Sequence, residues 1–505
     1  MTELTTILDQ QLAANPTRRI IKDEGLGTWF SGADLAEDVA TLQQAFAALG
    51  LGHGSQVLVC LPNAAVFPVI NQAAWHRGII VHPISPSTPV AELEADWRQH
   101  GYPVMLVTPT LAAAWSLGGF TQSELSLNTF ARIAVLAQAA RPAAAVTPVA
   151  DDDLALILNT SGTTGKPKRV GLTHAMLLNA ARYDAASNEM TDQDVAMITM
   201  PMFHINAQVM STLSSRIANA RIVVTPRFSA SRFWDQVADN GVTWVSVVPT
   251  IVSFLLLNEQ ANAAYQRLQD RIHLRYVRSS SFALPEERLR EFQDRFDTLI
   301  LEGYGMTEAA SQCTINPFTA PKIGSAGKPY GTEVRIVGTD GQRTTAAGVM
   351  GEITIRGDHV ITRYMDPNPD SFQDGWFLTG DLGYFDEDGY LFVKGRKKEI
   401  ISRGGEKVAP AAVENVLNEL DFIEQLAVIG MPDDLYGEAV CAVVVSTTPG
   451  VNEDAQRAAI FAYAKTHLAK FESPTEVRFV REFPRNITGK VLRPALQAQL
   501  LAATV

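Results

Sequence analysis

Residues Thr160 to Lys168 read TSGTTGKPK, a run of glycines and hydroxyl side chains that follows the apolar stretch LALILN. A loop of this composition after a strand exposes backbone N–H groups and hydroxyls, which suit phosphate oxygens. It differs from the P-loop of NTPases, because two residues separate Gly162 from Gly165 and Pro167 follows Lys166. Taken alone, the segment leaves two interpretations open, a phosphate-binding loop and an ordinary surface loop.

Other segments carry complementary chemistry. GYGMTE, at Gly303 to Glu308, sets an aromatic ring between glycines ahead of a hydroxyl and a carboxylate, which could stack on a base and bind Mg²⁺. LTGD, at Leu378 to Asp381, ends in a carboxylate that could accept hydrogen bonds from a ribose diol. Gly395-Arg396 follow the stretch LFVK, and PRNITGK, at Pro484 to Lys490, ends in a lysine. Each of these alone is more typical of a turn or a solvated charge.

Together and in this order, TSGTTGKPK, MFH, GYGMTE, TGD, GRKKEIISRGGEKV and the late TGK resemble the AMP-forming adenylating superfamily, which includes acyl-CoA synthetases, peptide-synthetase adenylation domains and firefly-type luciferases. The resemblance covers essentially the whole chain, including its length. It implies an acid–thiol ligase that uses ATP and Mg²⁺ to form an acyl-adenylate. The acyl group then passes to a thiol, coenzyme A in the first place, and AMP and pyrophosphate are released.

The resemblance also implies site residues. Thr160, Ser161, Gly162, Thr163, Thr164 and Lys168 match the loop that holds the β- and γ-phosphates, whereas Arg169 stands where the family usually has Gly. Tyr304 matches the residue that stacks on adenine, Thr307 the α-phosphate contact and Glu308 the Mg²⁺ ligand, and Asp381 and Arg396 match the pair that binds the ribose hydroxyls. Lys490 matches the catalytic lysine of the first half-reaction, and Lys398 matches the hinge. Gly404 and Gly405 match the segment that lines the pantetheine channel, and for these two glycines an ordinary turn is the alternative.

These roles agree with the chemistry. A carboxylate that attacks the α-phosphorus brings two anions together, so cations such as Lys490 and Mg²⁺ must neutralise the developing charge. Because Lys490 lies on the small domain, rotation of that domain would withdraw the lysine and admit a thiol.

The acid pocket in this family corresponds to Phe203, His204, Val248, Thr250, residues 278–282, Gly303, Met306 and Ser311. From this set, His204, Arg278, Ser280, Ser281, Gly303 and Met306 are predicted to bind the acid, and His204 is also a catalytic candidate. An arginine, three serines and a histidine favour a short polar acid, because arginine can bind a second carboxylate with two hydrogen bonds. For Arg278 the alternative is a structural ion pair with a carboxylate, and for His204 it is a buried core histidine.

Local sequence suggests which acid is activated. RFSASRFW and YVRSSSFALPEE resemble oxalate–CoA ligases, although Phe282 stands where a small residue is usual. INAQ and PRNITGK instead resemble carnitine and crotonobetaine ligases. Oxalate is therefore the first candidate. A carnitine-type or other short-chain acyl-CoA ligase and an enzyme that loads a carrier-protein thiol are the alternatives. A non-enzymatic nucleotide-binding protein is disfavoured, since every matched catalytic position is occupied.

The elements that must position these residues follow an α/β pattern. Helical periodicity at residues 33–49 and 64–77 alternates with short apolar strands at 56–62, 104–107 and 154–158, which is typical of parallel α/β layers. From Ile323, short strands separated by Asp-Gly and Gly turns predict a β-rich part, and DEDGY at 386–390 predicts a hairpin turn. The expected fold is α/β: a large N-terminal domain, 1–396, with its β-rich part at about 323–396, and a small mobile C-terminal α+β domain, 397–505.

Composition narrows the class of protein. A length of 505 residues corresponds to about three domains. The hydrophobic content of 46% excludes a disordered protein. The net charge of −12 disfavours nucleic-acid binding. The three separate cysteines exclude a disulfide framework and fit a reducing cytoplasm. No signal peptide is evident, and the apolar stretch 245–257 is too short to cross a bilayer. The expected partners are a small carboxylic acid, ATP and coenzyme A, with the oligomeric state left open, a homo-oligomer included.

Overall fold

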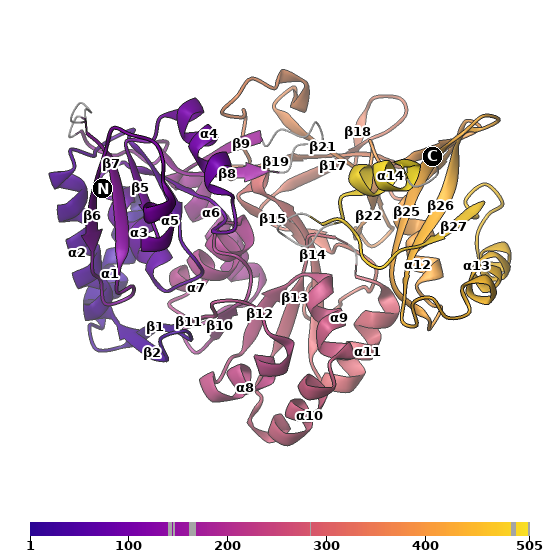
Figure 1. Cartoon of the computed structure of the whole chain (residues 1–505), viewed down its shortest axis with the longest axis horizontal. Coiled ribbons are helices and arrows are strands. Elements are labelled where there is room, and N and C mark those ends of the chain that lie inside the picture. The colour runs from indigo at the N-terminus through magenta and orange to yellow at the C-terminus, as the bar shows by residue number, and fades with distance from the viewer. Residues whose placement is uncertain (140–143, 145–146, 161–167, 283, 486–490, 503–505) are drawn as a thin grey trace.

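The computed structural model describes the chain except for residues 140–143, 145–146, 161–167, 283, 486–490 and 503–505 (Figure 1). A first sheet has the strand order β6-β7-β5-β3-β4-β8-β9. Its strands are β3 (Gln56–Cys60), β4 (Ile80–Pro83), β5 (Val104–Val107), β6 (Phe120–Leu125), β7 (Ile133–Gln138), β8 (Leu154–Thr160) and β9 (Lys168–Thr173). The central strands are parallel, as predicted, whereas β7 and β9 pair antiparallel at either side.

A second sheet has the order β16-β15-β14-β13-β12-β10-β11-β1-β2. It consists of β1 (Arg19–Asp23), β2 (Thr28–Ser31), β10 (Val195–Ile198), β11 (Arg221–Val224), β12 (Trp244–Val247), β13 (Tyr276–Ser279), β14 (Leu299–Met306), β15 (Ser311–Ile315) and β16 (Lys328–Pro329). The strands from β11 to β14 are parallel, and β14 then turns back into antiparallel β15. The carboxyl ends of β12 and β13 and the β14–β15 turn therefore face one region.

Helices cover these sheets. α2 (Gly32–Ala48) and α3 (Val66–Trp75) form where periodicity predicted them. At the start of α2, the Ser31 backbone N–H donates to Asp34 at 2.7 Å and the Asp34 N–H donates back to the Ser31 hydroxyl, a capping box. Along the rest of the sheets lie α1 (Glu3–Ala14), α4 (Val90–His100), α5 (Pro109–Ala114), α6 (His174–Ser187), the π-helix η1 (Asn206–Leu213), α7 (Ser214–Ile217), α8 (Ala230–Asn240), α9 (Pro249–Leu257), α10 (Glu259–Leu268) and α11 (Glu286–Phe296).

The apolar stretch 245–257 is divided between strand β12 and helix α9, with Pro249 at the first position of the helix. Proline is tolerated there because its missing N–H would have no intrahelical partner. Within the described residues, no helix has the length and apolar character that a membrane crossing requires.

The β-rich part forms as the turn-separated short strands predict. Its antiparallel sheet contains β17 (Glu333–Val337), β18 (Arg343–Thr344), β19 (Gly351–Arg356), β20 (Phe372–Gln373), β21 (Trp376–Phe385) and β22 (Leu391–Arg396). Residues 386–390 form the predicted hairpin turn, in which the Asp386 N–H donates to the Tyr390 carbonyl at 3.0 Å. The side chains of Asp386 and Asp388 both accept from Lys322, so these carboxylates are occupied by a lysine.

The C-terminal part is a small α+β unit. Its sheet comprises β23 (Ile401–Arg403), β24 (Glu406–Val408), β25 (Ile423–Asp433), β26 (Gly437–Ser446) and β27 (Glu476–Phe479), with helices α12 (Pro410–Leu417), α13 (Glu453–His467) and α14 (Arg493–Ala502). Its buried residues, such as Val413, Val440 and Ile460, form a hydrophobic cluster separate from that of the large domain. Figure 1 shows this unit beside the β-rich part, away from the N-terminus. The predicted α/β fold with a large and a small domain is confirmed.

Candidate active site

Tyr304, Asp381 and Arg396 come from three strands and meet in one cluster. The Tyr304 hydroxyl donates to Oδ2 of Asp381 at 2.6 Å, and Nε of Arg396 lies 2.7 Å from Oδ1 of the same carboxylate. Asp381 and Arg396 are cross-strand partners on β21 and β22, which accounts for their pairing. Burial, and next the charge of Asp381, raise the pKa of Tyr304 well above its ordinary value, so the hydroxyl keeps the proton it donates. The structure thus brings together the residues predicted to bind the nucleoside.

The predicted phosphate loop begins and ends on paired strands. Thr160 is the last residue of β8 and Lys168 the first of β9, and the two are paired in the antiparallel register. Nζ of Lys168 lies 4.5 Å from the centre of the Tyr364 ring and 3.4 Å from the Ser371 hydroxyl. Ser161, Gly162, Thr163 and Thr164 lie outside the described residues.

Positive charge gathers next to this hairpin. Burial lowers the pKa of Lys168, the carboxylate of Glu308 raises it, and the charges of Lys398 and Arg396 lower it further. Glu308, Lys398 and Arg396 therefore lie within electrostatic reach of Lys168, and in this group the cations outnumber the carboxylate. Such a cluster suits a polyanion such as the phosphate chain of ATP.

Thr307 and Glu308 lie on the short 3-10 turn η3 (Thr307–Ala309), which joins β14 to β15. The Tyr364 hydroxyl donates to Oε1 of Glu308 at 2.7 Å and so fixes the orientation of this carboxylate. Because Nζ of Lys168 also stacks on the Tyr364 ring, that tyrosine joins the predicted metal ligand to the predicted phosphate lysine. Tyr364 was not identified from the sequence.

A small cavity of about 60 Å³ lies where the acid pocket was predicted. Its lining includes five residues that the sequence placed there, Arg278, Ser280, Ser281, Met306 and Ser311, and five others: Ile205, Asn206, Met210, Gly305 and Gln312. Since a single water needs about 10–15 Å³ of such space, this cavity has room for about four to six waters.

Arg278 is the charged residue of this cavity. It is the third residue of β13, is 1% exposed, and donates from Nε and Nη2 to Oε1 of Gln312 at 2.9 and 2.5 Å. Among the described residues its Nη1 has no hydrogen-bond partner, and no carboxylate lies within ion-pair distance of it. Burial lowers the pKa of Arg278, and the more distant Asp184 opposes that shift. In the described part of the chain, Arg278 thus forms no ion pair of the kind that the alternative interpretation requires.

Gly303 acts on this pocket through its missing side chain. A Cβ at this position would lie 2.7 Å from Nη2 and 3.0 Å from Cζ of Arg278. The guanidinium thus occupies space that only glycine leaves open. Gly303 is not itself among the residues that line the cavity, so it shapes the site from behind the arginine.

His204 lies beside the pocket, outside the residues that line it. Its ring centre is 4.4 Å from that of Phe203, and its Nε2 is buried without a hydrogen-bond partner among the described residues. Burial lowers the pKa of His204 to about 4, so the ring is neutral near pH 7. A neutral, partly buried ring suits the predicted position at the pocket and adds no charge to it.

The C-terminal residues of the prediction lie at two places. Lys398 lies two residues after Arg396, and its charge reaches Lys168. Gly404 and Gly405 form the turn between β23 and β24, with φ angles of +59° and +93°. This left-handed backbone favours glycine. The pair therefore forms a hairpin turn, and its predicted role in the pantetheine channel stays a prediction. Lys490 lies outside the described residues.

Sequence reasoning missed several polar residues of the pocket, chiefly Gln312 and Asn206. Gln312 lies on β15, where every residue is buried. A polar side chain in such a strand needs a partner, and Arg278 needs an acceptor. That pair of requirements is the signal that could have identified Gln312.

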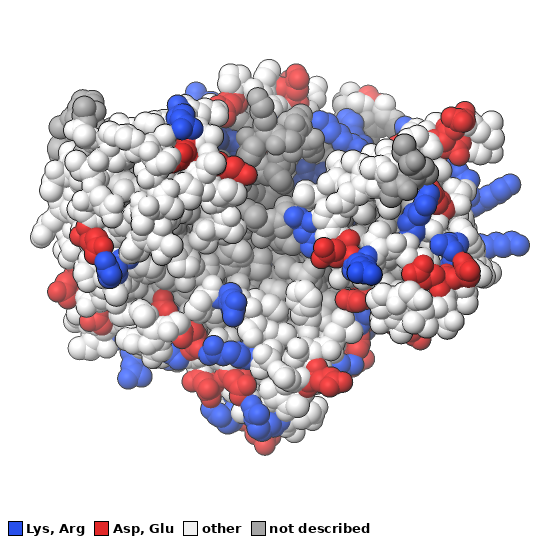
Figure 2. All heavy atoms as spheres, viewed as in Figure 1, with Lys and Arg blue, Asp and Glu red and all other residues white. Residues whose placement is uncertain are grey.

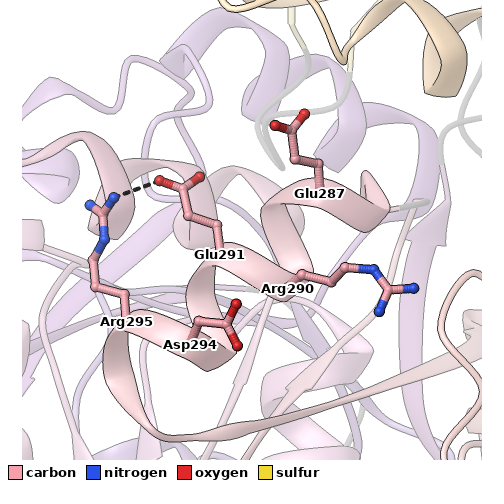
Figure 3. A pocket seen from close by; sticks show the side chains of 5 residues that line it. All are labelled: Glu287, Arg290, Glu291, Asp294 and Arg295. Carbon is pink, nitrogen blue, oxygen red and sulfur yellow. Dashed lines mark hydrogen bonds and ion pairs between the residues drawn. The ribbon is translucent and has the colours of Figure 1, made fainter.

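A larger hollow of about 540 Å³ lies elsewhere, along helix α11 (Figure 3). Its side chains are Glu287, Arg290, Glu291, Asp294 and Arg295, and Glu291 pairs with Arg295 at 2.6 Å. All five belong to one helix face and are unrelated to the catalytic cluster. The smaller cavity, by contrast, is lined by residues that were predicted to bind the acid.

Comparisons with known proteins agree with these observations. Residues 8–365 match the AMP-binding enzyme family and residues 412–490 match the AMP-binding enzyme C-terminal domain. The chain is 33% identical over 504 residues to the sulfoacetate–CoA ligase of Cupriavidus necator, covering 97% of this chain and 96% of that protein. It is 37% identical over 352 residues to the oxalate–CoA ligase of Arabidopsis thaliana, covering 68% and 66%. The ATP-bound crystal structure of MatB from Rhodopseudomonas palustris has a TM-score of 0.83 and 26% identity, covering 97% and 98%.

Proposed function

The chain belongs to the AMP-binding enzyme family and is an acyl-CoA ligase that uses ATP and coenzyme A, and from this premise we propose that its acid is short and carries a second anionic group, with oxalate as the first candidate. The proposal concerns the acid and the roles of individual residues. One observation carries it: a buried arginine lines the cavity of about 60 Å³ and has one nitrogen free of any described partner.

The charge of Arg278 explains why the far group should be anionic. A buried cation without a counter-ion is unfavourable, because its lost hydration is not replaced. A carboxylate or sulfonate at the far end of the acid would supply both the charge and the hydrogen-bond acceptor that Nη1 lacks. Two similar proteins are named for sulfoacetate and oxalate, both of which are short acids with two anionic groups. The serines at 280, 281 and 311 would complete the contacts to such oxygens.

For the nucleotide, we propose the roles that the family resemblance implies, and the contacts among Tyr304, Asp381 and Arg396 support those of the nucleoside residues. Tyr304 would stack on adenine, and Asp381, held by Arg396, would accept from the ribose hydroxyls. Lys168 and the loop residues 160–164 would bind the β- and γ-phosphates, and Thr307 the α-phosphate. Lys490 would neutralise charge while the acid carboxylate attacks the α-phosphorus and pyrophosphate leaves.

Magnesium fits the same site. Glu308 offers a carboxylate oxygen, a ligand that this hard cation prefers, and the hydrogen bond from Tyr364 holds that carboxylate in one orientation. When bound with ATP, Mg²⁺ would neutralise phosphate charge. Thr307 places a hydroxyl next to the carboxylate in the same turn.

For the second half-reaction, we propose a domain boundary after Arg396 and a hinge at Lys398. Rotation of residues 397–505 would move Lys490 away and bring the Gly404-Gly405 turn toward the thiol. The thiol sulfur would then attack the acyl carbon, and AMP would leave.

A cytoplasmic location, suggested by three separate cysteines, is supported by their free, buried state in the structure.

Pyrophosphate release with a panel of acids tests the proposal. We expect oxalate, malonate or sulfoacetate to give a kcat/KM at least tenfold above that of propionate, crotonate, carnitine and palmitate. A preference for carnitine or crotonate would instead support the alternative ligase, and a preference for palmitate would contradict a short acid altogether. Replacing coenzyme A by a carrier-protein pantetheine in the same assay identifies the thiol acceptor.

A further inference from the structure

Gln312 is held at both ends of its side-chain amide. Its Oε1 accepts two hydrogen bonds from Arg278 on β13, and its Nε2 donates to the Ser187 hydroxyl, at the end of α6, at 2.8 Å. The side chain is 3% exposed. A chain of contacts thus runs from helix α6 through strand β15 to the arginine of the cavity.

The chemistry of the three side chains determines how the Gln312 amide is oriented. A guanidinium has donors only, so the amide oxygen must face Arg278 and the amide nitrogen must face Ser187. Two of the three guanidinium nitrogens are then occupied along one edge. The third, Nη1, is left without a partner among the described residues. Gly303 leaves the guanidinium room to lie in this plane.

The partner of Arg278 is a neutral amide where a carboxylate of the same shape would also fit. A carboxylate would form a charge-neutral pair with two hydrogen bonds and would satisfy the arginine within the protein. Glutamine supplies the same two bonds and leaves the positive charge uncompensated. The nearest carboxyl that influences Arg278 is Asp184 of α6, which bonds to Ser311 and is not within ion-pair distance.

From these contacts we infer that Gln312, held by Ser187, is a positioning and specificity-determining residue: it fixes Arg278 in the pocket and, because it is neutral, reserves the arginine's charge for the second anionic group of the acid. This inference rests on the proposed function and deepens it. Gln312 touches the acid pocket, but its effect on specificity acts through Arg278.

Gln312→Glu is the direct test, since it changes one atom and adds one negative charge. The Ser187 hydroxyl can rotate to donate to the new carboxylate, so the contacts can survive. We expect kcat/KM for oxalate, malonate and sulfoacetate to fall at least tenfold relative to that for propionate and crotonate. The KM for ATP should be unchanged, and the melting temperature should not fall, because the buried arginine gains a counter-ion.

Two companion variants complete the experiment. Gln342→Glu adds the same charge on the exposed turn between β17 and β18 and should leave the ranking of acids unchanged. Ser187→Ala removes the bond that holds the amide, together with the longer contacts of the same hydroxyl to the Asp184 carbonyl at 3.3 Å and from the Asn188 amide at 3.5 Å. It should raise KM for the doubly anionic acids, with a smaller effect than Gln312→Glu and little change in kcat. If Gln312→Glu does not fold, Ser187→Ala decides the question.

The outcomes separate this inference from the proposed function. If the wild-type enzyme prefers doubly anionic acids but Gln312→Glu, or Ser187→Ala in its place, keeps that preference, the inference is overturned and the proposed function stands. An equal loss for all acids together with a lower melting temperature would show a purely structural role and also overturn it. If the wild-type enzyme prefers acids with a single charge, both fail.

Discussion

At the scale of single residues, the position of Arg278 is the informative one. Arginines on the surface of this protein pair with carboxylates, for example Arg356 with Glu333 at 2.8 Å. Such exposed pairs contribute only about 0–1 kcal/mol, because water screens them. Arg278 is 1% exposed and has a neutral partner, an arrangement that lowers stability. A protein retains such a residue when a ligand supplies the missing charge.

Replacing Arg278 by Leu should therefore change specificity. Loss of a charge-assisted contact of about 1.5–3 kcal/mol corresponds to a roughly ten- to hundredfold rise in KM for a small dicarboxylic acid. The KM for ATP should change far less, because the nucleotide cluster is built on other strands. A short monocarboxylic acid should bind better than before, since no buried cation is left unpaired. Relative kcat/KM for oxalate, malonate, propionate and crotonate measures this change.

Arg275→Leu is the matched control for that experiment. Arg275 precedes the same strand but pairs with Asp194 at 3.0 Å, outside the pocket. Its loss should lower the melting temperature and leave the ranking of acids as it was. If Arg278→Leu behaves in the same way, Arg278 does not belong to the acid site.

Asp184, behind the pocket on α6, predicts an unusual pH dependence. Burial raises the pKa of Asp184 to about 7, against the opposing effects of its hydrogen bond with Ser311 and the charge of Arg278. Between about pH 4 and 7 the folded protein thus keeps a proton here that the unfolded chain has lost. The contribution of this group to stability falls as pH rises through that range. The melting temperature of Asp184→Asn, relative to that of the wild type, should accordingly rise between pH 5 and 8. If the two melting temperatures change in parallel with pH, this prediction is contradicted.

What could be predicted at this scale depends on whether the signal is local. Arg278 was found because the resemblance to the family places residues 278–282 in the acid pocket, and an arginine followed by serines is conspicuous there. Gln312 and Ser187 were not found, because their roles exist only once α6 packs on β15 and the Gln312 side chain reaches Arg278 on β13. The side chains of Tyr304, Asp381 and Arg396 were predicted from motifs, and the structure adds that they bond to one another.

At the scale of elements, the β23–β24 hairpin provides a test of the second half-reaction. Gly404 has φ +59°, and a Cβ there would lie 2.9 Å from the ring of Tyr436. If this turn lines the thiol channel, Gly404→Ala should slow thioester formation at least tenfold while adenylate formation continues. Gly450→Ala, in the same domain with φ +75° and open space around it, controls for backbone strain alone. Separate assays of pyrophosphate release and acyl-CoA formation distinguish the steps, and an equal effect of both variants would contradict a channel role.

Element prediction worked where burial imposes a period and failed where pairing is long-range. α2 buries Leu35, Val39, Leu42 and Phe46, a helical spacing that the sequence shows directly. Strand β6 is mostly exposed and polar, so no apolar pattern in the sequence predicts it. It forms because it pairs with β7. β9 was likewise missed: it returns antiparallel to β8 across the phosphate loop, a pairing that the parallel α/β pattern does not predict.

At the scale of the whole molecule, the distribution of charge matters more than its sum. The chain carries a net charge of −12, yet ATP, coenzyme A and the proposed acid are all anions. Figure 2 shows acidic and basic side chains interspersed over the visible face. The charges of Arg396 and Lys398 instead act on Lys168 at the proposed nucleotide site, and Arg278 lines the proposed acid pocket. The anionic substrates are therefore attracted by the cations near the site. Salt screens the repulsion from carboxylates that lie more than a Debye length of about 8–10 Å away.

Lys490 provides the test of domain movement. The small domain has its own hydrophobic core. Lys398, at the proposed hinge, influences Lys168 of the proposed nucleotide site through its charge. A rigid unit attached by a short segment can rotate as one body. If Lys490 contacts the acid and the α-phosphate only before that rotation, Lys490→Ala should abolish adenylate formation, by at least a hundredfold. Thioester formation from a pre-made acyl-adenylate should remain within a few fold of the wild type, because the thiol attack takes place after the lysine has left.

The two half-reactions must therefore be measured separately on the same variant, by pyrophosphate release and by acyl-CoA formation from synthetic adenylate. Arg481→Ala is a suitable control, because it removes a cation from an exposed position shortly before the same segment. Both half-reactions should proceed normally in that protein. An equal loss of both in Lys490→Ala would mean that the lysine stays at the site throughout the cycle, and a boundary after Arg396 with a hinge at Lys398 would then have no mechanistic purpose.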